Sequence, residues 1–333
     1  MQSIGIGGIY WRMRIGRARK RGQCVSASVL ASICGWLVFR SSEMQSGGRR
    51  QCWTANAGAD LRAGRVLKCP PRTGAGLRLH DANELSFQSR GRRSSPFIYE
   101  PFRIMFCWIP KVACTKYKQL FMKMALHQNW SNKDHVHSLE PNVQALQTFT
   151  HELEYVNDVI EDPRWLRVVV LRDPFERFMS AYLNKVVQSK CSMLGRKCSL
   201  KATAADVEVF LKTFPWKDDR HFGLQREFCG FEKYRPIWNR VALYGHNIDL
   251  QATTSALFDG LLDVPISHGW GTRDAGMWTA LAANETKSQQ PQLLCEICRN
   301  AKVFTMVMDS YMPDYEFFQL PVPNICSSCR PVA

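Results

Sequence analysis

Two apolar runs near the middle of the chain have the pattern of buried β-strands that lead into helices. Residues 103–109 (RIMFCWI) are almost continuously apolar and end at Pro110, which is typical of a strand inside a sheet. Residues 115–127 (TKYKQLFMKMALH) instead repeat apolar side chains at helical spacing, at Tyr117, Leu120, Phe121 and Met124. The pattern predicts a strand, a short loop and a helix.

A second strand is predicted over residues 166–171 (LRVVVL), and it runs through Arg172 into another helix. The start of that helix is well specified. Asp173 is a good N-cap, Pro174 suits the first helical position, and Glu176 has the spacing of a capping box.

Strands that are each followed by a loop and a helix favour an α/β fold, with a P-loop-like, mostly parallel sheet flanked by helices and joined by right-handed crossovers. Further helices are predicted over residues 203–214, 251–262 and 293–310. Residues 311–318 (YMPDYEFF) predict a closing, aromatic-rich helix.

The net charge of +15 is concentrated before Pro96. Residues 1–96 hold 17 Lys or Arg against 4 acidic residues, a net charge of +13, which leaves +2 for the rest of the chain. This segment is rich in Arg, Gly and Ser and has no sustained apolar period after residue 40, so we expect most of it to be a basic, largely disordered stem. The predicted domains are therefore an N-terminal segment, 1–96, and a globular domain, 97–333.

One apolar stretch within the N-terminal segment, residues 24–39, follows a cluster of basic residues between Arg12 and Arg21. As a helix it would reach roughly 24 Å, short of the roughly 30 Å hydrocarbon core of a bilayer. Basic residues before an apolar run favour a signal anchor with the body of the chain in the lumen. An Arg-rich, Ser-rich and acid-poor start is equally typical of an organelle transit peptide, and a mispredicted leader is a third alternative.

Thirteen cysteines are many for a reducing compartment and favour lumenal disulfides. Cys191 and Cys198 bracket a basic loop and are candidates for one pair. The chain also holds two CxxC pairs, Cys295/Cys298 and Cys326/Cys329. These four thiols could bind zinc, but their wide separation and an intervening predicted helix favour disulfides or free thiols.

Anionic ligands bind parallel sheets where strands end and helices begin, because backbone N–H groups and the positive end of the helix point there. The first such place is residues 109–116 (IPKVACTK), where Lys111 is a point charge able to reach a phosphate or sulfate oxygen. Spacing alone favours a solvated loop lysine. No GxxxxGK[ST] loop occurs in the chain, which removes the best support for an NTP-dependent kinase.

The second such place is residues 170–182 (VLRDPFERFMSAY). Arg172 leaves the predicted strand at the carboxyl edge of the sheet, and Ser180 lies two turns into the helix, so both could bind one phosphate. The alternative is an Arg–Glu network around the helix cap, formed by Arg172, Glu176 and Arg177.

Together the two segments resemble the Golgi carbohydrate sulfotransferases that modify chondroitin, dermatan and terminal glucuronic acid. KVACTKYK is similar to the 5′-phosphosulfate loop of that family, and LRDPFERFMSAY is similar to its 3′-phosphate motif, in the same order along the chain. Residues 133–137 (KDHVH), 221–229 (HFGLQREFC) and 311–318 extend the resemblance, which covers about residues 97 to 320. The run YGHN at 244–247 departs from the family pattern, so the acceptor cannot be copied over.

The resemblance implies a sulfotransferase domain over residues 97–333 that moves a sulfuryl group from 3′-phosphoadenosine 5′-phosphosulfate (PAPS) to a carbohydrate hydroxyl by in-line displacement. It implies that Arg172 and Ser180 bind the 3′-phosphate. Around the 5′-phosphosulfate it places Lys111, Val112, Ala113, Cys114, Thr115 and Lys116. It also implies a Golgi membrane protein of the single-pass type II kind with a lumenal catalytic domain, a glycan acceptor, and no metal.

Sulfuryl transfer needs a base near the acceptor hydroxyl and positive charge near the departing phosphate. The resemblance puts forward His135 as the base, with His137 as the next choice, against a plain surface histidine in a polar run. Lys111 would also stabilise charge on the bridging oxygen. For His221 we favour core packing over a place in the acceptor groove, and we expect Cys114 to be a small reduced residue rather than a nucleophile.

Two other classes of function stay open from the sequence. A catalytically inactive glycan- or nucleotide-binding relative would keep the fold without the chemistry, although Lys111, Arg172, Ser180 and His135 are all in place. Nucleic-acid binding through the basic N-terminal segment is disfavoured, because the near-neutral body offers no recognised base-reading motif. Asn129 and Asn284 lie in glycosylation sequons if the body is lumenal, although glycosylation of Asn129 is doubtful so close to the predicted site.

Overall fold

The computed structural model describes residues 53–54, 56–70, 77–89, 92–124, 147–148, 153–191, 197–245, 250–258 and 285–329. The chain divides between residues 50 and 51, and residues 51–333 form a compact unit of their own. The predicted anchor at 24–39 and most of the predicted stem lie outside the described residues. No helix in the described part of the chain has the length and apolar character needed to cross a bilayer.

The core of this unit is a six-stranded mixed sheet with the order β1-β8-β7-β5-β4-β6. Its strands are β1 (Leu67–Lys68), β4 (Phe97–Tyr99), β5 (Ile104–Cys107), β6 (Gln147–Thr148), β7 (Leu166–Arg172) and β8 (Arg240–Tyr244). The three central strands β5, β7 and β8 are parallel, whereas β1, β4 and β6 pair antiparallel at the two edges. The predicted α/β fold is confirmed, with the parallel pairing confined to the centre of the sheet.

The central strands are buried on both faces, which is why they appear in the sequence as mostly continuous apolar runs rather than alternating ones. Every residue of β7 after Leu166 is buried, and Val168 lies in register with Phe106 of β5 and Arg240 of β8. A separate two-stranded sheet joins β2 (Phe87–Ser89) to β3 (Arg92–Ser94).

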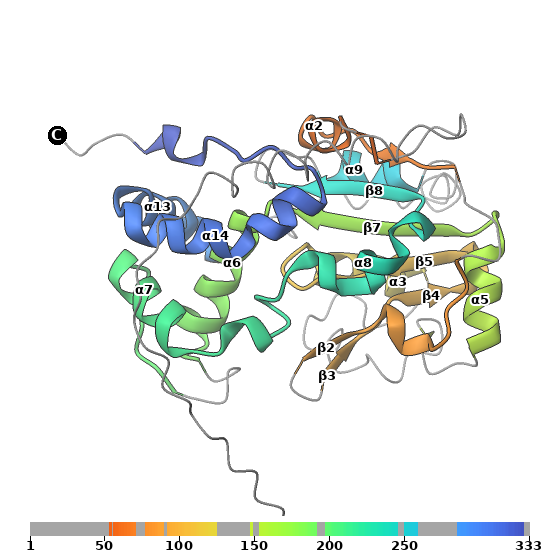
Figure 1. Ribbon diagram of the computed structural model, residues 1–333, viewed down its shortest axis with the longest axis horizontal. Helices are drawn as coiled ribbons and strands as arrows, with labels where there is room; N and C mark the ends of the chain where they lie inside the picture. Colours follow the sequence, from red (N-terminus) through yellow and green to blue (C-terminus); the bar gives the residue numbers. More distant parts are fainter. Residues whose placement is uncertain are drawn as a thin grey trace, which may run out of the picture. The chain divides into compact units, whose positions relative to one another are not determined.

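Helices cover the sheet, and several of them gather beyond its carboxyl edge (Figure 1). The α-helices are α2 (Ala57–Arg62), α3 (Cys114–Met124), α5 (Leu153–Glu161), α6 (Pro174–Ala181), α7 (Ala204–Thr213), α8 (Phe231–Tyr234), α9 (Leu250–Leu257), α13 (Glu285–Arg299) and α14 (Ala301–Phe317). A π-helical segment, η4 (Tyr182–Gln188), continues α6. Short 3-10 turns are η2 (Ala82–Leu85), η3 (Glu100–Phe102), η6 (Trp216–Asp218), η7 (Gln225–Gly230), η8 (Arg235–Ile237) and η10 (Ile325–Ser328).

Helices α6 and α7 begin where the sequence predicted, directly after a residue that caps the helix. Asp173 caps α6 by accepting hydrogen bonds from the backbone N–H groups of Phe175 and Glu176, and Thr203 caps α7. Helix α9 starts near the predicted position, although residues 259–262 of that prediction lie outside the described residues.

The prediction of one helix over residues 293–310 was wrong, because the chain breaks between α13 and α14. Asn300 has an extended backbone there, and its side chain accepts a hydrogen bond from the N–H of Val303, so it ends one helix and caps the next. The predicted closing helix over residues 311–318 is the second half of α14 rather than a separate element.

The folded unit also includes elements that precede Pro96. Strand β1 pairs with β8, with Leu67 opposite Val241. Helix α2 packs closely on the chain after α14, since a Cβ on Gly58 would lie 1.7 Å from the carbonyl oxygen of Gln319. The compact unit therefore extends N-terminally beyond the predicted boundary, through elements too short to show a periodic apolar pattern.

Candidate active site

A sharp loop connects the end of β5 to the start of α3 and forms the first half of the site. Lys111 and Ala113 have positive φ angles of 69° and 51°, and the N–H of Val112 donates to the carbonyl of Ile109 over 3.2 Å. Left-handed backbone at non-glycine residues is uncommon and is often found at ligand-binding loops. The turn brings the N-terminus of α3, which begins at Cys114, directly behind the loop.

The Lys111 side chain is held within this site rather than extended into solvent. Its Nζ donates a hydrogen bond to Oδ1 of Asn184, on η4, over 2.7 Å. Burial, together with the positive charges of Lys185, Arg172 and Arg177, lowers the pKa of Lys111 from 10.5 to about 7. The site thus concentrates positive charge that a bound anion would neutralise, and the simple solvated lysine is not what the structure contains.

Arg172 joins the second motif to the loop. It is the last residue of β7, and its Nη1 donates to the carbonyl oxygen of Lys111 over 3.1 Å. The amide of Gln225 fixes its backbone from both sides, accepting from the Arg172 N–H over 2.9 Å and donating to the Arg172 carbonyl over 2.8 Å. The two motifs therefore meet at the carboxyl edge of neighbouring parallel strands, as the sheet rule predicts.

The Arg–Glu network considered as an alternative forms only in part. Arg172 Nε lies 3.6 Å from Glu176 Oε2, on the first turn of α6. On α6 the only residues that are not buried are Glu176 and Ser180, which are four residues apart on one face of the helix. Ser180 therefore shares the exposed face of α6 with the carboxylate that contacts Arg172.

Arg177 has a different role, which the sequence did not reveal. Its guanidinium is fully buried and donates three hydrogen bonds to backbone carbonyls: to Pro110 over 2.9 Å, Gly223 over 2.6 Å and Arg220 over 3.1 Å. These bonds join the loop that contains Lys111 to the segment around residues 220–223. An arginine placed between apolar residues of a predicted helix is the one sequence signal that could have pointed to such a role.

The end of α14 supports the same region from behind. The buried carboxylate of Asp314 accepts hydrogen bonds from the N–H groups of Gln225, over 2.8 Å, and Arg226, over 3.0 Å. Tyr311 donates to the carbonyl of Phe222 over 2.8 Å, and Tyr315 donates to Oδ1 of Asp173 over 3.0 Å. The YMPDY segment therefore stabilises both the Arg172 backbone and the start of α6.

His221 is buried, as favoured from the sequence, but it lies beside the site rather than deep in the core. Its Nδ1 is 2.7 Å from Oδ1 of Asp219, and its exposed fraction is 9%. Burial, opposed by Asp219 and reinforced by Lys185 and Lys111, lowers the pKa of His221 to about 4.

The proposed base, His135, and the next choice, His137, lie outside the described residues. Val112 is buried in the loop, whereas Ala113, Cys114, Thr115 and Lys116 are half-buried at the start of α3. Within the described part of the chain, Cys114 is a free thiol, as expected.

The other cysteines in the described residues form disulfides. Cys191 pairs with Cys198 as predicted. The two CxxC motifs pair with each other as Cys295–Cys329 and Cys298–Cys326, which agrees with the preference for disulfides over zinc. A further bond that the sequence did not suggest, Cys107–Cys229, connects β5 to η7. Among the described residues no group of His, Cys, Asp or Glu side chains has the arrangement of a metal site.

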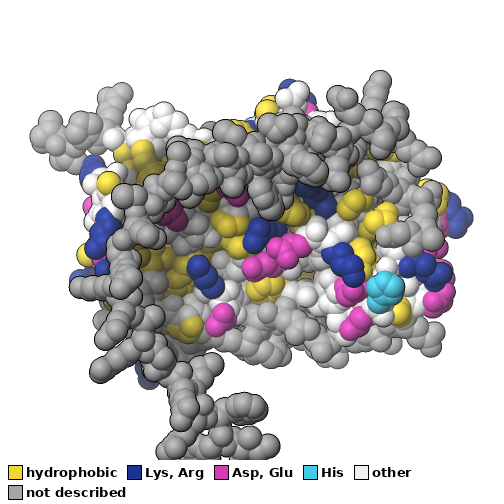
Figure 2. Space-filling view, in the orientation of Figure 1, with side chains coloured by type: hydrophobic (Ala, Val, Ile, Leu, Met, Phe, Trp, Pro, Cys, Tyr) yellow, Lys and Arg dark blue, Asp and Glu magenta, His cyan; other side chains and the backbone are white. Residues whose placement is uncertain are grey.

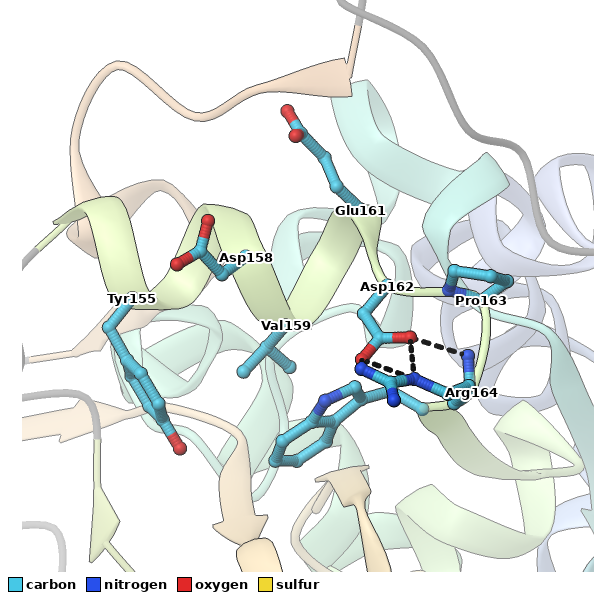
Figure 3. Close-up of a pocket in the computed structure, with 8 residues that line it drawn as sticks. Tyr155, Asp158, Val159, Glu161, Asp162, Pro163 and Arg164 are labelled. Atoms are coloured by element: carbon cyan, nitrogen blue, oxygen red, sulfur yellow. Dashed lines mark hydrogen bonds and ion pairs between the residues drawn. The ribbon is translucent and has the colours of Figure 1, made fainter.

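A cavity of about 580 Å³ lies elsewhere, at the turn between α5 and β7 (Figure 3). This turn precedes β7, so it is at the opposite end of that strand from Arg172. Its acidic side chains include Asp158, Glu161 and Asp162, and Asp162 is paired with Arg164 over 2.7 Å. Carboxylates repel anions, and none of the predicted site residues lines this cavity, so it is not a candidate donor site.

The charge on the visible face of the molecule is mixed. Figure 2 shows basic and acidic side chains interspersed among the described residues of this face, without one broad patch of either sign. This agrees with the nearly neutral charge of residues 97–333. The positive charge that could bind an anion is therefore the local group of cations around Lys111.

The chain belongs to the sulfotransferase family, whose model matches residues 96–321. It is similar to carbohydrate sulfotransferase 11 of Rattus norvegicus, with 32% identity over 91 residues, which cover 27% of this chain and 25% of the relative. The carbohydrate sulfotransferase 11 of Danio rerio is 33% identical over 88 residues, or 26% of this chain and 24% of the relative. The chain thus aligns with about a quarter of the length of these relatives. No solved structure matches it.

Proposed function

We propose that the protein is a PAPS-dependent carbohydrate O-sulfotransferase. The observation that supports this most strongly is the meeting of Lys111 and Arg172, with Arg177 behind them, at the carboxyl edge of parallel strands β5 and β7. A ligand with separate 5′ and 3′ anionic groups suits a site with two cationic ends. The carbohydrate acceptor is suggested by the names of the similar proteins.

In this proposal the 5′-phosphosulfate lies against Lys111 and the loop backbone from Val112 to Thr115, with Lys116 at its flank. Arg172 and Ser180 bind the 3′-phosphate, which would explain a preference for PAPS over ATP. Backbone N–H groups at a helix start and a nearby lysine are typical ligands of such anions.

The proposed reaction is an in-line displacement at sulfur. The acceptor oxygen forms a bond to sulfur while the bond from sulfur to the bridging phosphate oxygen breaks, and 3′-phosphoadenosine 5′-phosphate (PAP) leaves with that oxygen. The proton of the hydroxyl passes to the proposed base, His135, and Lys111 stabilises the negative charge that develops on the bridging oxygen. No metal has a role in this scheme.

Binding of PAP to the full chain, measured by calorimetry, tests the donor site. We expect micromolar binding that requires the 3′-phosphate, and a loss of roughly 10- to 100-fold in affinity for both Lys111→Ala and Arg172→Ala, because each removes a charge-assisted contact of about 1.5–3 kcal/mol. Lys212→Ala is the matched control, since Lys212 is an exposed lysine paired with Glu208 on α7. Equal binding of ATP, or no binding by a folded wild-type chain, would contradict the proposal.

A catalytically inactive relative of the same fold is the second candidate. It would bind PAP normally but would not transfer sulfate from PAPS to any glycan. Transfer to desulfated chondroitin, dermatan or heparosan, followed by mass spectrometry of the product, separates the two candidates.

We further propose that the protein is a Golgi membrane protein, a single-pass type II protein with a lumenal catalytic domain, anchored through residues 24–39. The four disulfides among the described residues support an oxidising compartment. The partners are then a glycan acceptor and the membrane, and the basic N-terminal segment is not expected to serve nucleic-acid binding.

A further inference from the structure

His221 and Asp219 form a pair with a fixed geometry. The backbone N–H of His221 donates to Oδ1 of Asp219 over 2.8 Å, and Nδ1 of the ring lies 2.7 Å from the same oxygen. The pKa of Asp219 is lowered, although burial opposes this, because its contacts with His221 and Arg220 favour the charged form. An ionised Asp219 accepts a hydrogen from Nδ1, which leaves the lone pair on Nε2.

This pair lies next to the loop that contains Lys111. The guanidinium of Arg177 hydrogen-bonds the carbonyls of Arg220 and Gly223, on either side of His221, and also the carbonyl of Pro110, which directly precedes Lys111. The charged groups that act on the ring are Asp219, Lys185 on η4, and Lys111. His221 is therefore at the same end of the site as the lysine proposed to face the sulfate.

The surroundings of His221 determine what its ring can bind. Burial and two nearby lysines disfavour protonation and keep the imidazole neutral at neutral pH. The ring is about nine-tenths buried, and the contact with Asp219 that orients it is made through Nδ1, on the other side of the ring from Nε2. A neutral Nε2 without a hydrogen accepts a hydrogen bond but cannot donate one. It therefore suits a hydroxyl group, which has a hydrogen to donate, and not an anionic phosphate or sulfate.

We propose that His221, oriented by Asp219, is an acceptor-binding residue whose Nε2 accepts a hydrogen bond from a hydroxyl of the sugar that lies beside the sulfate. This inference rests on the proposed function. It assigns to His221 a role in positioning the acceptor, distinct from the proton transfer proposed for His135.

Steady-state kinetics on the full chain test this role, with saturating PAPS and the acceptor that the wild type sulfates best among desulfated chondroitin, dermatan and heparosan. We expect His221→Leu to lower kcat/KM for the acceptor roughly 10- to 100-fold, because a buried hydroxyl of the sugar loses its partner. His221→Gln, whose amide oxygen can replace Nε2 as acceptor, should recover much of that loss. His80→Gln, on an exposed histidine, is the control.

The pH profile and PAP affinity distinguish this role from a structural one. The wild-type acceptor KM should rise as the pH falls toward the pKa of His221, because a protonated ring no longer accepts a hydrogen bond, and His221→Gln should lack this acid limb. Asp219→Asn should weaken acceptor binding, whereas the control, His80→Gln, should leave it unchanged. PAP affinity should stay within about threefold of the wild type in every variant, since the donor does not bind Nε2.

The outcomes are separable. An unchanged acceptor KM in a folded His221→Leu chain, or a loss of PAP affinity as large as the loss of acceptor affinity, would overturn the role of His221. A wild-type chain that fails to bind PAP, or that binds PAP and sulfates none of the three acceptors, would instead refute the proposed function itself.

Discussion

At the scale of single residues, the candidate site consists of positively charged side chains on a backbone that is held in a fixed conformation. Lys111 has a left-handed backbone and a partly buried side chain, and the carbonyl of the same residue accepts a hydrogen bond from Arg172. Both features cost folding free energy in the unliganded chain, since strain and desolvation are each unfavourable. A bound anion would offset the electrostatic part of that cost.

The lowered pKa of Lys111 predicts how PAP binding depends on pH. Above about pH 7 the free chain loses the Lys111 proton, while the phosphate of PAP favours the charged form, so binding must take up a proton. We therefore expect PAP affinity to fall as the pH rises above about 7, by up to about tenfold per unit. Calorimetry in buffers of different ionisation enthalpy measures this uptake.

Lys111→Arg provides the comparison for this experiment. Arginine stays charged at these pH values, so this variant should bind PAP with an affinity that hardly changes between pH 7 and 9. A pH-independent affinity in the wild type, or the same fall in both chains, would show that Lys111 does not titrate with ligand binding.

Residue types with a strong local meaning were predictable from the sequence. Asp173 as a cap, and Lys111 and Arg172 at strand ends, follow from the positions of apolar runs and helix signals. Gln225, Asn184 and Arg177 were not predictable, because each contacts a partner at least 46 residues away. Nothing in the sequence near these residues indicates the pairing.

At the scale of elements, α14 supports the proposed donor site and is not an independent closing helix. Asp314 binds the start of η7, and Gln225 of η7 in turn binds the backbone of Arg172. The break at Asn300 sets the direction of α14 separately from that of α13. The sequence predicted a single helix here because a polar residue such as Asn300, within a run of helical apolar spacing, does not by itself indicate a cap.

This arrangement predicts that Gln225→Leu weakens recognition of the 3′-phosphate. Leucine removes both hydrogen bonds to the Arg172 backbone and leaves two buried polar groups unsatisfied, at a cost of about 1–3 kcal/mol each before relaxation. We expect the ratio of PAP affinity to adenosine 5′-monophosphate affinity to fall roughly tenfold, because in the proposed function Arg172 binds the 3′-phosphate, which adenosine 5′-monophosphate lacks. Calorimetry with both nucleotides gives this ratio.

Asp314→Asn should have a milder effect in the same direction, because its amide group can replace only one of two carboxylate oxygens. Asp309→Asn, on an exposed residue of the same helix, is the matched control and should change nothing. If the Gln225→Leu chain is less stable but keeps its preference for PAP, the hydrogen bonds from Gln225 to Arg172 serve the fold alone.

At the scale of the whole molecule, the sequence predicted the α/β fold and two of its three central parallel strands, β5 and β7, but neither β8 nor the antiparallel edges. Strands β1 and β6 have two residues each, too few for a periodic signal. These short strands pair because the neighbouring strand has unpaired backbone N–H and C=O groups at the edge of the sheet. Their own composition does not determine the pairing. The start of the folded unit before Pro96 was missed for the same reason.

The proposed location predicts the behaviour of the full chain in cells. A chain with a C-terminal tag should colocalise with a Golgi marker, and the tag should resist protease until the membrane is permeabilised. Removal of residues 24–39 should release the chain from the membrane fraction. A mitochondrial or plastid signal would support a transit peptide instead, and a tag digested in intact vesicles would exclude the type II orientation.

The bond between Cys107 and Cys229 has a consequence for how this protein is made. The two cysteines are 122 residues apart, whereas Cys191 and Cys198 are separated by only 7. In the proposed type II orientation the part of the chain that follows the anchor enters the oxidising lumen in sequence order, so Cys107 is exposed there before Cys229 arrives. During that interval the thiol of Cys114, in the loop proposed to bind the donor, is the nearer available cysteine. Correct maturation of the site then depends on keeping these two thiols apart, or on thiol–disulfide exchange that separates them again.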